Sequence, residues 1–138
     1  MRGVNKVILM GKLGTDPDIL YLEGNVPVSK FRLATTQTFK DKNGKPLSQT
    51  EWHNVVVWRG LAELSHKYLH KGSSVYIEGR IKTRHWEDRD HQRKAITEII
   101  ADNLIILDKQ SDLPNSDGDP ELIFQNNSQS ESHENNNA

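Results

Sequence analysis

The 138-residue sequence contains no cysteine, and this absence removes several kinds of chemistry at once. Disulfides, cysteine-ligated zinc and thiol nucleophiles are excluded, and a lack of cysteine is typical of proteins from a reducing compartment. The early apolar run Val7-Ile8-Leu9-Met10 is too short for the hydrophobic region of a signal peptide and far short of the ~20 residues of a membrane span. We therefore expect a cytoplasmic protein that is neither exported nor inserted in a membrane.

Familiar catalytic motifs are missing as well. The sequence has no Walker A loop, no G-x-S-x-G and no Rossmann glycine pattern. His66 and His70 have a metal-ligand spacing, but no Glu follows His66 as an H-E-x-x-H motif requires. Asp88 and Asp90 imitate a paired-carboxylate site, yet they lie among charged neighbours in a predicted turn. We interpret these pairs as a solvated helix face and a solvated loop, and we expect no enzyme, metal or cofactor.

Charge is divided unevenly along the chain. Residues 1–108 carry 17 Lys and Arg against 13 Asp and Glu, a charge of +4, whereas residues 109–138 carry 1 against 6, a charge of -5, which together give the net -1. Of the last 30 residues, 14 are Asn, Gln or Ser and few are apolar, so burial cannot offset the entropy of ordering them. The sequence thus predicts a basic domain over 1–108 and a disordered acidic tail over 109–138.

Within the domain, apolar residues mostly alternate with polar ones, which is typical of strands. One segment, 60–72, instead repeats apolar residues at helical spacing and ends at Gly72, which is placed to cap a helix. Asn43-Gly44 is a strong hairpin signal between two β-rich segments. Five strands are predicted, at Val4–Leu13, Val28–Phe39, Thr50–Arg59, Ser74–Trp86 and Arg93–Leu107. An all-β chain with one short helix between strands three and four has the element order of an OB-fold, a five-stranded barrel, although other small β folds share this order.

The alternation also predicts which side chains face the core. On the second predicted strand, Phe31 and Leu33 face inward while Lys30 and Arg32 face outward. The inward residues of the fourth are expected to be Val75, Ile77 and Ile81. The first strand is apolar on both sides, so both faces are expected to be at least partly buried. One face holds Val4, Ile8 and Met10, and the other holds Val7, Leu9 and Leu13.

Aromatic and basic side chains alternate out of phase with this core pattern. Trp52 and Trp58 share one face of the third predicted strand. Arg80, Lys82, Arg84 and Trp86 form a stripe on the fourth, back to back with its core residues. Single-stranded nucleic acid needs this combination, since cations follow phosphates and flat rings stack on unpaired bases. An isolated tryptophan is more often a core residue, but several aromatics interleaved with cations favour a binding face.

Several segments along the domain form a longer pattern. They are Arg2-Gly-Val-Asn-Lys-Val-Ile-Leu9, Gly11, Leu13-Gly14, Asp16-Pro17, Gln49-Thr-Glu-Trp-His53-Asn-Val-Val56, Tyr68-Leu, Lys71-Gly-Ser73, Val75-Tyr-Ile-Glu-Gly79, Thr83-Arg84 and Trp86. In these segments the sequence resembles the bacterial-type single-stranded DNA-binding proteins. The similarity covers about residues 1–107, and the length and order of the segments make it highly specific.

The resemblance implies an OB-fold that assembles as a homotetramer and assigns roles to particular residues. Its base-stacking aromatics correspond to Phe39, Trp52, Trp58 and Trp86. Its subunit-interface histidine corresponds to His53, and a phosphate-contacting lysine of the family is replaced by Gly60, with Arg59 adjacent. The expected phosphate contacts combine the family's basic positions with the cations of the stripe on the fourth predicted strand. They are Arg2, Lys6, Lys40, Arg59, Lys71, Arg80, Lys82, Arg84 and Lys94.

The C-terminus departs from the family, which normally ends in an acidic run closed by Pro-Phe that recruits replication and repair enzymes. Here the chain ends in Asn135-Asn-Asn-Ala138. Acidic and apolar residues do occur together upstream, and a candidate recruitment motif consists of Asp117, Asp119, Pro120 and Phe124. An ordinary disordered linker is the alternative.

The sequence therefore predicts non-enzymatic, sequence-tolerant binding and protection of single-stranded DNA during replication, recombination and repair. Two other functions remain open. An assembly module of a primosome-like complex would act mainly through protein contacts, and an RNA-binding OB module would prefer ribose. The expected partners are single-stranded DNA, further copies of the chain and, through the tail, replication and repair enzymes.

Overall fold

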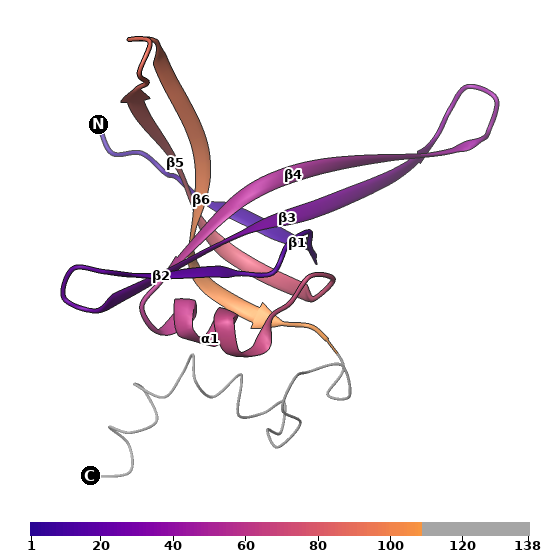
Figure 1. Cartoon of the computed structure of the whole chain (residues 1–138). Coiled ribbons are helices and arrows are strands. Elements are labelled where there is room, and N and C mark those ends of the chain that lie inside the picture. The colour runs from indigo at the N-terminus through magenta and orange to yellow at the C-terminus, as the bar shows by residue number, and fades with distance from the viewer. Residues whose placement is uncertain (109–138) are drawn as a thin grey trace.

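The computed structural model describes residues 1–108, so the predicted tail and its candidate recruitment motif lie outside the described residues. The predicted order of five long strands with a helix between the third and fourth is confirmed, and a short extra strand was missed. The elements are β1 (Val7–Leu13), β2 (Asp18–Leu22), β3 (Val26–Lys40), β4 (Pro46–Trp58), α1 (Gly60–Tyr68), β5 (Ser74–Glu87) and β6 (Arg93–Ile106) (Figure 1).

Five of the strands close into a barrel. The sheet runs β1-β5-β6-β4-β3-β2, and an additional pairing of β1 with β3 joins its ends, which leaves β2 outside as a short edge strand on β3. β4 and β6 are parallel, with Val55 opposite Ile99, while the other pairs are antiparallel. A closed five-stranded barrel with one helix is the OB-fold architecture, as predicted from the element order.

Two hairpins extend beyond the barrel as arms, one formed by β3 and β4 and the other by β5 and β6 (Figure 1). Their turns are built alike, because Oδ1 of Asp41 and of Asp88 accepts backbone N–H bonds from the residues two and four positions later, at 2.8–2.9 Å. Gly44 has a φ of +80°, which favours glycine at the predicted Asn43-Gly44 turn. Asp88 is thus a turn residue and not half of a carboxylate pair.

The barrel interior is filled from alternating strand positions. Phe31 and Leu33 are buried while Lys30 and Arg32 are exposed, so the predicted alternation is confirmed there. α1 packs Leu64 into the same interior. The remaining buried residues of the cluster are Leu13, Val55, Val57, Ala62, Leu69, Val75, Ile77, Ile99, Ala101, Leu104 and Ile106.

One core prediction is wrong, and another holds for only one face of β1 in the single chain. On β1, Val7 and Leu9 pack against the core, and Ile8 and Met10 on the other face are 58% and 64% exposed. On β5, Ile81 is exposed although Val75 and Ile77 are fully buried. The strand pairing shifts register between Glu78 and Gly79, and every β5 residue from Arg80 on is exposed. The pairing of β5 with β1 ends at Gly79, opposite Val7, whereas β6 stays paired with β4 through Ile99 and Ile100.

The end of α1 also differs from the prediction. The helix ends at Tyr68, and Leu69 follows in an extended conformation. Gly72, with a φ of +93°, turns the chain into β5 and donates its N–H to the Leu13 carbonyl at 2.8 Å, so it does not cap the helix. Within residues 1–108, no three potential metal-ligating His, Cys, Asp or Glu residues form a cluster, and no helix has the length and apolarity needed to cross a bilayer.

Candidate nucleic-acid interface

Strand register brings the predicted functional residues of four strands onto one outer surface. Trp58 of β4 lies opposite Val28 of β3, and Trp52 lies opposite Ala34. Val56, between the two tryptophans, is the register partner of Ile100 on β6. Ile100 in turn lies opposite Arg80 of β5. We call this surface the basic-aromatic face. It is defined by Lys30, Arg32, Trp52, Trp58, Arg80, Lys82, Arg84, Trp86 and Glu98.

The three tryptophans of this face are not core residues. Trp52, Trp58 and Trp86 are 49%, 41% and 46% exposed. The Trp52 ring lies so close to Gly14 that a Cβ there would meet it at 2.2 Å, and the Arg32 guanidinium lies 4.7 Å from the ring centroid. A half-exposed indole that is held in place can stack on a base at little cost in side-chain entropy.

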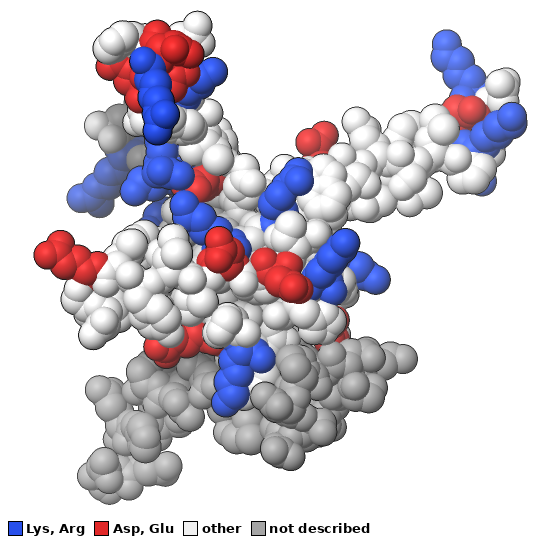
Figure 2. All heavy atoms as spheres, in the orientation of Figure 1, with Lys and Arg blue, Asp and Glu red and all other residues white. Residues whose placement is uncertain are grey.

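Phe39 lies elsewhere. It is opposite Leu47 on the β3–β4 arm, at positions that alternate with those of Trp52 and Ala34, so the register places it on the other side of the hairpin from the basic-aromatic face. Both Phe39 and Leu47 are exposed. Lys40 follows Phe39, and the tip of the arm carries a group of basic side chains (Figure 2). The structure therefore brings together three of the four predicted stacking residues.

The predicted phosphate contacts fall into two groups. Four of these cations already have acidic partners, namely Lys6 with Glu78, Arg80 with Asp102, Arg84 with Glu98, and Lys94 with Asp88. The other five have no ion pair within residues 1–108 and are Arg2, Lys40, Arg59, Lys71 and Lys82. Cations without a partner are the ones that gain most from a phosphate, because nothing has to be displaced.

Some of these cations lie at the border of the face. Arg59 lines a hollow of about 510 Å³ together with Trp58, Arg80 and Lys82. The backbone N–H of Lys71 donates to Asp16 Oδ1 at 2.7 Å. Asp16 lines a neighbouring hollow, so this bond holds the loop that contains Lys71 close to it. Arg2 belongs to the segment before β1, where the Asn5 side chain exchanges two hydrogen bonds with the backbone of Ile81.

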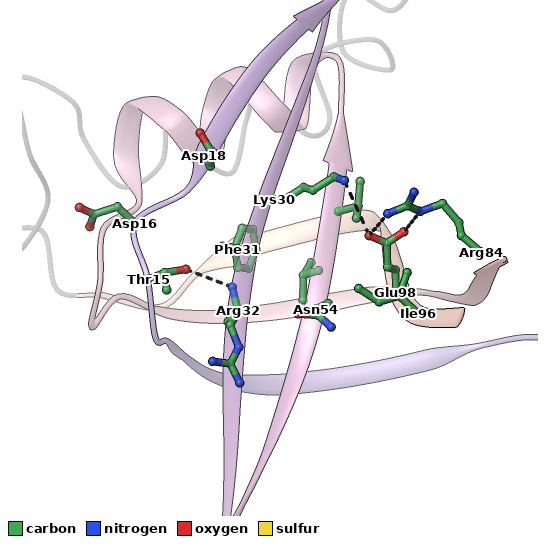
Figure 3. Close-up of a pocket in the computed structure, with 12 residues that line it drawn as sticks. Thr15, Asp16, Asp18, Lys30, Phe31, Arg32, Asn54, Arg84, Ile96 and Glu98 are labelled. Carbon is green, nitrogen blue, oxygen red and sulfur yellow. Dashed lines mark hydrogen bonds and ion pairs between the residues drawn. The ribbon is translucent and has the colours of Figure 1, made fainter. Parts of the chain in front are cut away.

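A buried carboxylate lies in the middle of the face. Glu98 is only 4% exposed, and Arg84 and Lys30 lie beside it (Figure 3). Arg84 donates from Nε to Oε1 at 2.7 Å and from Nη2 to Oε2 at 3.3 Å, while Lys30 Nζ lies 3.9 Å from Oε2. The hydrogen bonds and charge of Glu98 raise the pKa of Arg84 above its ordinary value. The two hydrogen bonds to Glu98 hold the guanidinium in a fixed orientation.

Sequence reasoning did not select Lys30, Arg32 or Glu98 as parts of the site. Lys30 and Arg32 were predicted to face outward, and that alternation was the available signal. Placing Arg32 beside Trp52 requires the β3–β4 register, and placing Glu98 beside Arg84 requires the β5–β6 register beyond its shift. Neither register can be read from composition or periodicity.

A second surface lies on β1 and β5 and is apolar on the β1 side. Ile8 and Met10 are opposite Glu78 and Tyr76, so the four share one side of the sheet. Tyr76 donates its hydroxyl to Glu78 Oε1 at 2.6 Å, and this bond raises the pKa of Tyr76 and lowers that of Glu78. His53, the predicted interface residue, is half-buried on β4 and hydrogen-bonds Thr35 at 2.9 Å.

The comparisons with known proteins all find similarity to single-stranded DNA-binding proteins. The model of the Single-strand binding protein family matches residues 4–107. A single-stranded DNA-binding protein of Xylella fastidiosa strain Temecula1 is 46% identical over 111 residues, which cover 80% of this chain and 68% of that protein. Single-stranded DNA-binding protein 1 of strain 9a5c is 42% identical over 113 residues, 81% of this chain and 83% of that protein. A solved Plasmodium falciparum SSB complex with ssDNA matches with a TM-score of 0.72 at 40% identity, covering 78% of this chain and 98% of the other.

Proposed function

The chain belongs to the single-strand binding protein family, and from that premise we propose that its basic-aromatic face is where it binds single-stranded DNA. The observation that carries this proposal is the gathering of three half-exposed tryptophans with five Lys and Arg residues on one surface of four strands. Bases stack on the indoles, and phosphates pair with the cations that have no acidic partner.

Such a surface binds with little regard to sequence, because every base has a flat face and every nucleotide a phosphate. The protein coats and protects exposed strands during replication, recombination and repair. Binding and not catalysis is the activity we infer, with no metal or cofactor required, and the cytoplasm is its proposed location. An oligo-dT titration that shows no binding would contradict the proposed function.

Phosphate contacts are tested by the salt dependence of binding. Replacing Lys82 with Gln removes a cation of the face that has no ion pair within residues 1–108. The slope of log affinity against log salt should become shallower by roughly 0.7, the contribution of one phosphate on a single strand. Lys67→Gln on α1 removes the same charge outside the face and should leave the slope unchanged. Equal slopes for all three proteins would exclude a phosphate contact at Lys82.

Two alternative functions make different predictions about the ligand. An RNA-binding module would bind oligo-rU more tightly than oligo-dT of the same length, because a 2′-hydroxyl would be read. A primosome-like assembly module would bind both weakly while associating tightly with protein. The exposed tryptophans favour the DNA-binding role, and a side-by-side titration of the two oligomers separates the three possibilities.

We also propose that the protein is a homotetramer. The exposed apolar side of β1, with Ile8 and Met10, is a surface that association would cover. Placing a charge there should dissociate the assembly, because an unpaired charge is costly to bury. Ile8→Glu should therefore yield smaller species by light scattering, whereas Tyr21→Glu, on the edge strand β2, should not. A concentration-independent monomer for the unmodified protein would refute the assembly. His53→Glu tests the inherited interface role of His53 in the same way.

For residues 109–138, we propose a separate acidic tail that follows the binding domain and recruits replication and repair enzymes. The proposal rests on sequence, since Asp117, Asp119, Pro120 and Phe124 combine acidic and apolar groups. One aromatic anchor can dominate a small interface, so Phe124→Ala should abolish pull-down of cognate enzymes without changing DNA affinity. If pull-down is unaffected, or absent even for the unmodified tail, the motif does not recruit partners.

A further inference from the structure

Arg84 is held differently from the other cations of the basic-aromatic face. Two of its guanidinium N–H groups are bound by Glu98, whose side chain is only 5% exposed, while the Arg84 side chain remains 49% exposed. A carboxylate that binds Nε and Nη2 approaches the guanidinium at its edge and lies in its plane. This leaves the flat surfaces of the group uncovered by Glu98 (Figure 3).

Arg84 and Glu98 lie at the boundary between two hollows. The first, of about 360 Å³, is bordered by the loop after β1 and has Phe31, Val56 and Ile96 in its lining (Figure 3). The second, of about 510 Å³, has Leu20, Val28 and Trp58 in its lining. Both linings also contain charged side chains, and that of the second includes Arg59, Arg80 and Lys82. A nucleobase can therefore contact the apolar residues of either hollow while its phosphate pairs with a neighbouring cation.

The charge of Arg84 is also already paired with that of Glu98. A phosphate that approached Arg84 would meet the Glu98 carboxylate 2.7 Å from Nε, whereas Lys82, on the same strand, has no acidic partner within residues 1–108. A planar guanidinium stacks well on aromatic rings, which an ammonium cannot do. The position of Arg84 therefore favours a base over a phosphate.

We propose that Arg84 is a base-stacking platform of the strand-binding face and that Glu98 is the positioning residue that fixes it and withholds it from phosphates. This inference rests on the proposed function and deepens it. The strand then follows Lys82 and Arg59 with its phosphates and turns bases toward the hollows on either side of Arg84. Stacking on this face thus uses a guanidinium in addition to the three indoles.

The test compares oligo-dT with an abasic deoxyribose-phosphate strand of the same length, using the full chain. Arg84→Lys keeps the charge and can keep the ion pair with Glu98, but it removes the flat group. Affinity for oligo-dT should fall by about fivefold or more, the lower end expected for one stacked base. Affinity for the abasic strand and the salt slope should stay the same. Lys82→Gln should show the opposite pattern, with a shallower slope and weaker binding of both strands.

Glu98→Gln tests the positioning role, because a purely structural role of Glu98 would leave the salt slope of DNA binding unchanged. Freed from the carboxylate, Arg84 should neutralise a phosphate, so the slope should steepen by roughly 0.7 while oligo-dT loses its advantage over the abasic strand. Asp102→Asn makes the same charge change at the exposed partner of Arg80 and should not alter that advantage. If Glu98→Gln fails to fold, Arg84→Lys alone decides the proposal.

Two results would overturn the inference. Unchanged oligo-dT affinity in Arg84→Lys would show that Arg84 acts only as a charge, and an equal loss on both strands would show general damage and not lost stacking. Neither result touches the proposed function, which is tested separately by oligo-dT binding of the unmodified protein and by changes to the tryptophans of the face. Thermal unfolding midpoints of all variants establish that the compared proteins are folded.

Discussion

Replacing Trp86 with Ala is expected to weaken binding of oligo-dT by about 1 to 3 kcal/mol, the range measured when a base loses its aromatic partner. Trp86 is 46% exposed near the end of the β5–β6 arm, so its removal leaves no cavity in the barrel. The melting temperature should therefore barely change. A fluorescence or anisotropy titration at fixed salt measures the loss.

Two variants make this result specific to stacking on the face. Trp86→Phe keeps a ring and should retain most of the affinity. Tyr21 is 60% exposed but alternates with Leu20 and Leu22 on β2, on the side turned away from the basic-aromatic face, so Tyr21→Ala should bind normally. If Trp86→Ala binds oligo-dT as tightly as the unmodified protein, Trp86 does not stack on the strand.

Replacing Leu33 with Ala should have the opposite consequence, a large loss of folding stability. Leu33 is fully buried in the barrel interior, and truncating a buried leucine typically costs about 2 to 5 kcal/mol. Its neighbour Arg32 points to the basic-aromatic face, so at temperatures where the variant is folded its affinity for oligo-dT should be close to normal. Chemical denaturation followed by a binding titration measures both quantities. A stable Leu33→Ala protein would contradict the described core.

The contrast between Arg32 and Leu33 shows why the sequence predicts so much of this molecule. Strand alternation assigns each residue to one of two faces, and where a strand forms the barrel wall those faces are the core and the binding surface. The same reasoning failed for Ile81, because β5 continues as an arm after its shift near Gly79 and no longer has a core beneath it. Periodicity reports the sides of a strand but not what covers them.

The missed strand has a comparable explanation. β2 consists of Asp18–Leu22, between two clusters of turn-forming residues, and its apolar residues are consecutive and not alternating. Its strand conformation comes from pairing with β3 across a tight turn in which Gly24 and Asn25 have positive φ. Similarly, the contact of Arg84 with Glu98 joins residues 14 apart and depends on the register of the β5–β6 arm. Such cross-strand pairings become visible only in three dimensions.

The central claim is that bases stack on the tryptophans of the basic-aromatic face, and photocrosslinking tests it most directly. The full-length protein would be irradiated with an oligo-dT in which single thymines are replaced by 5-iodouracil, and the adducts would be mapped by mass spectrometry. The account predicts adducts on Trp52, Trp58 and Trp86. Adducts on Tyr21 of β2 or Tyr68 of α1, with none on these three tryptophans, would contradict it.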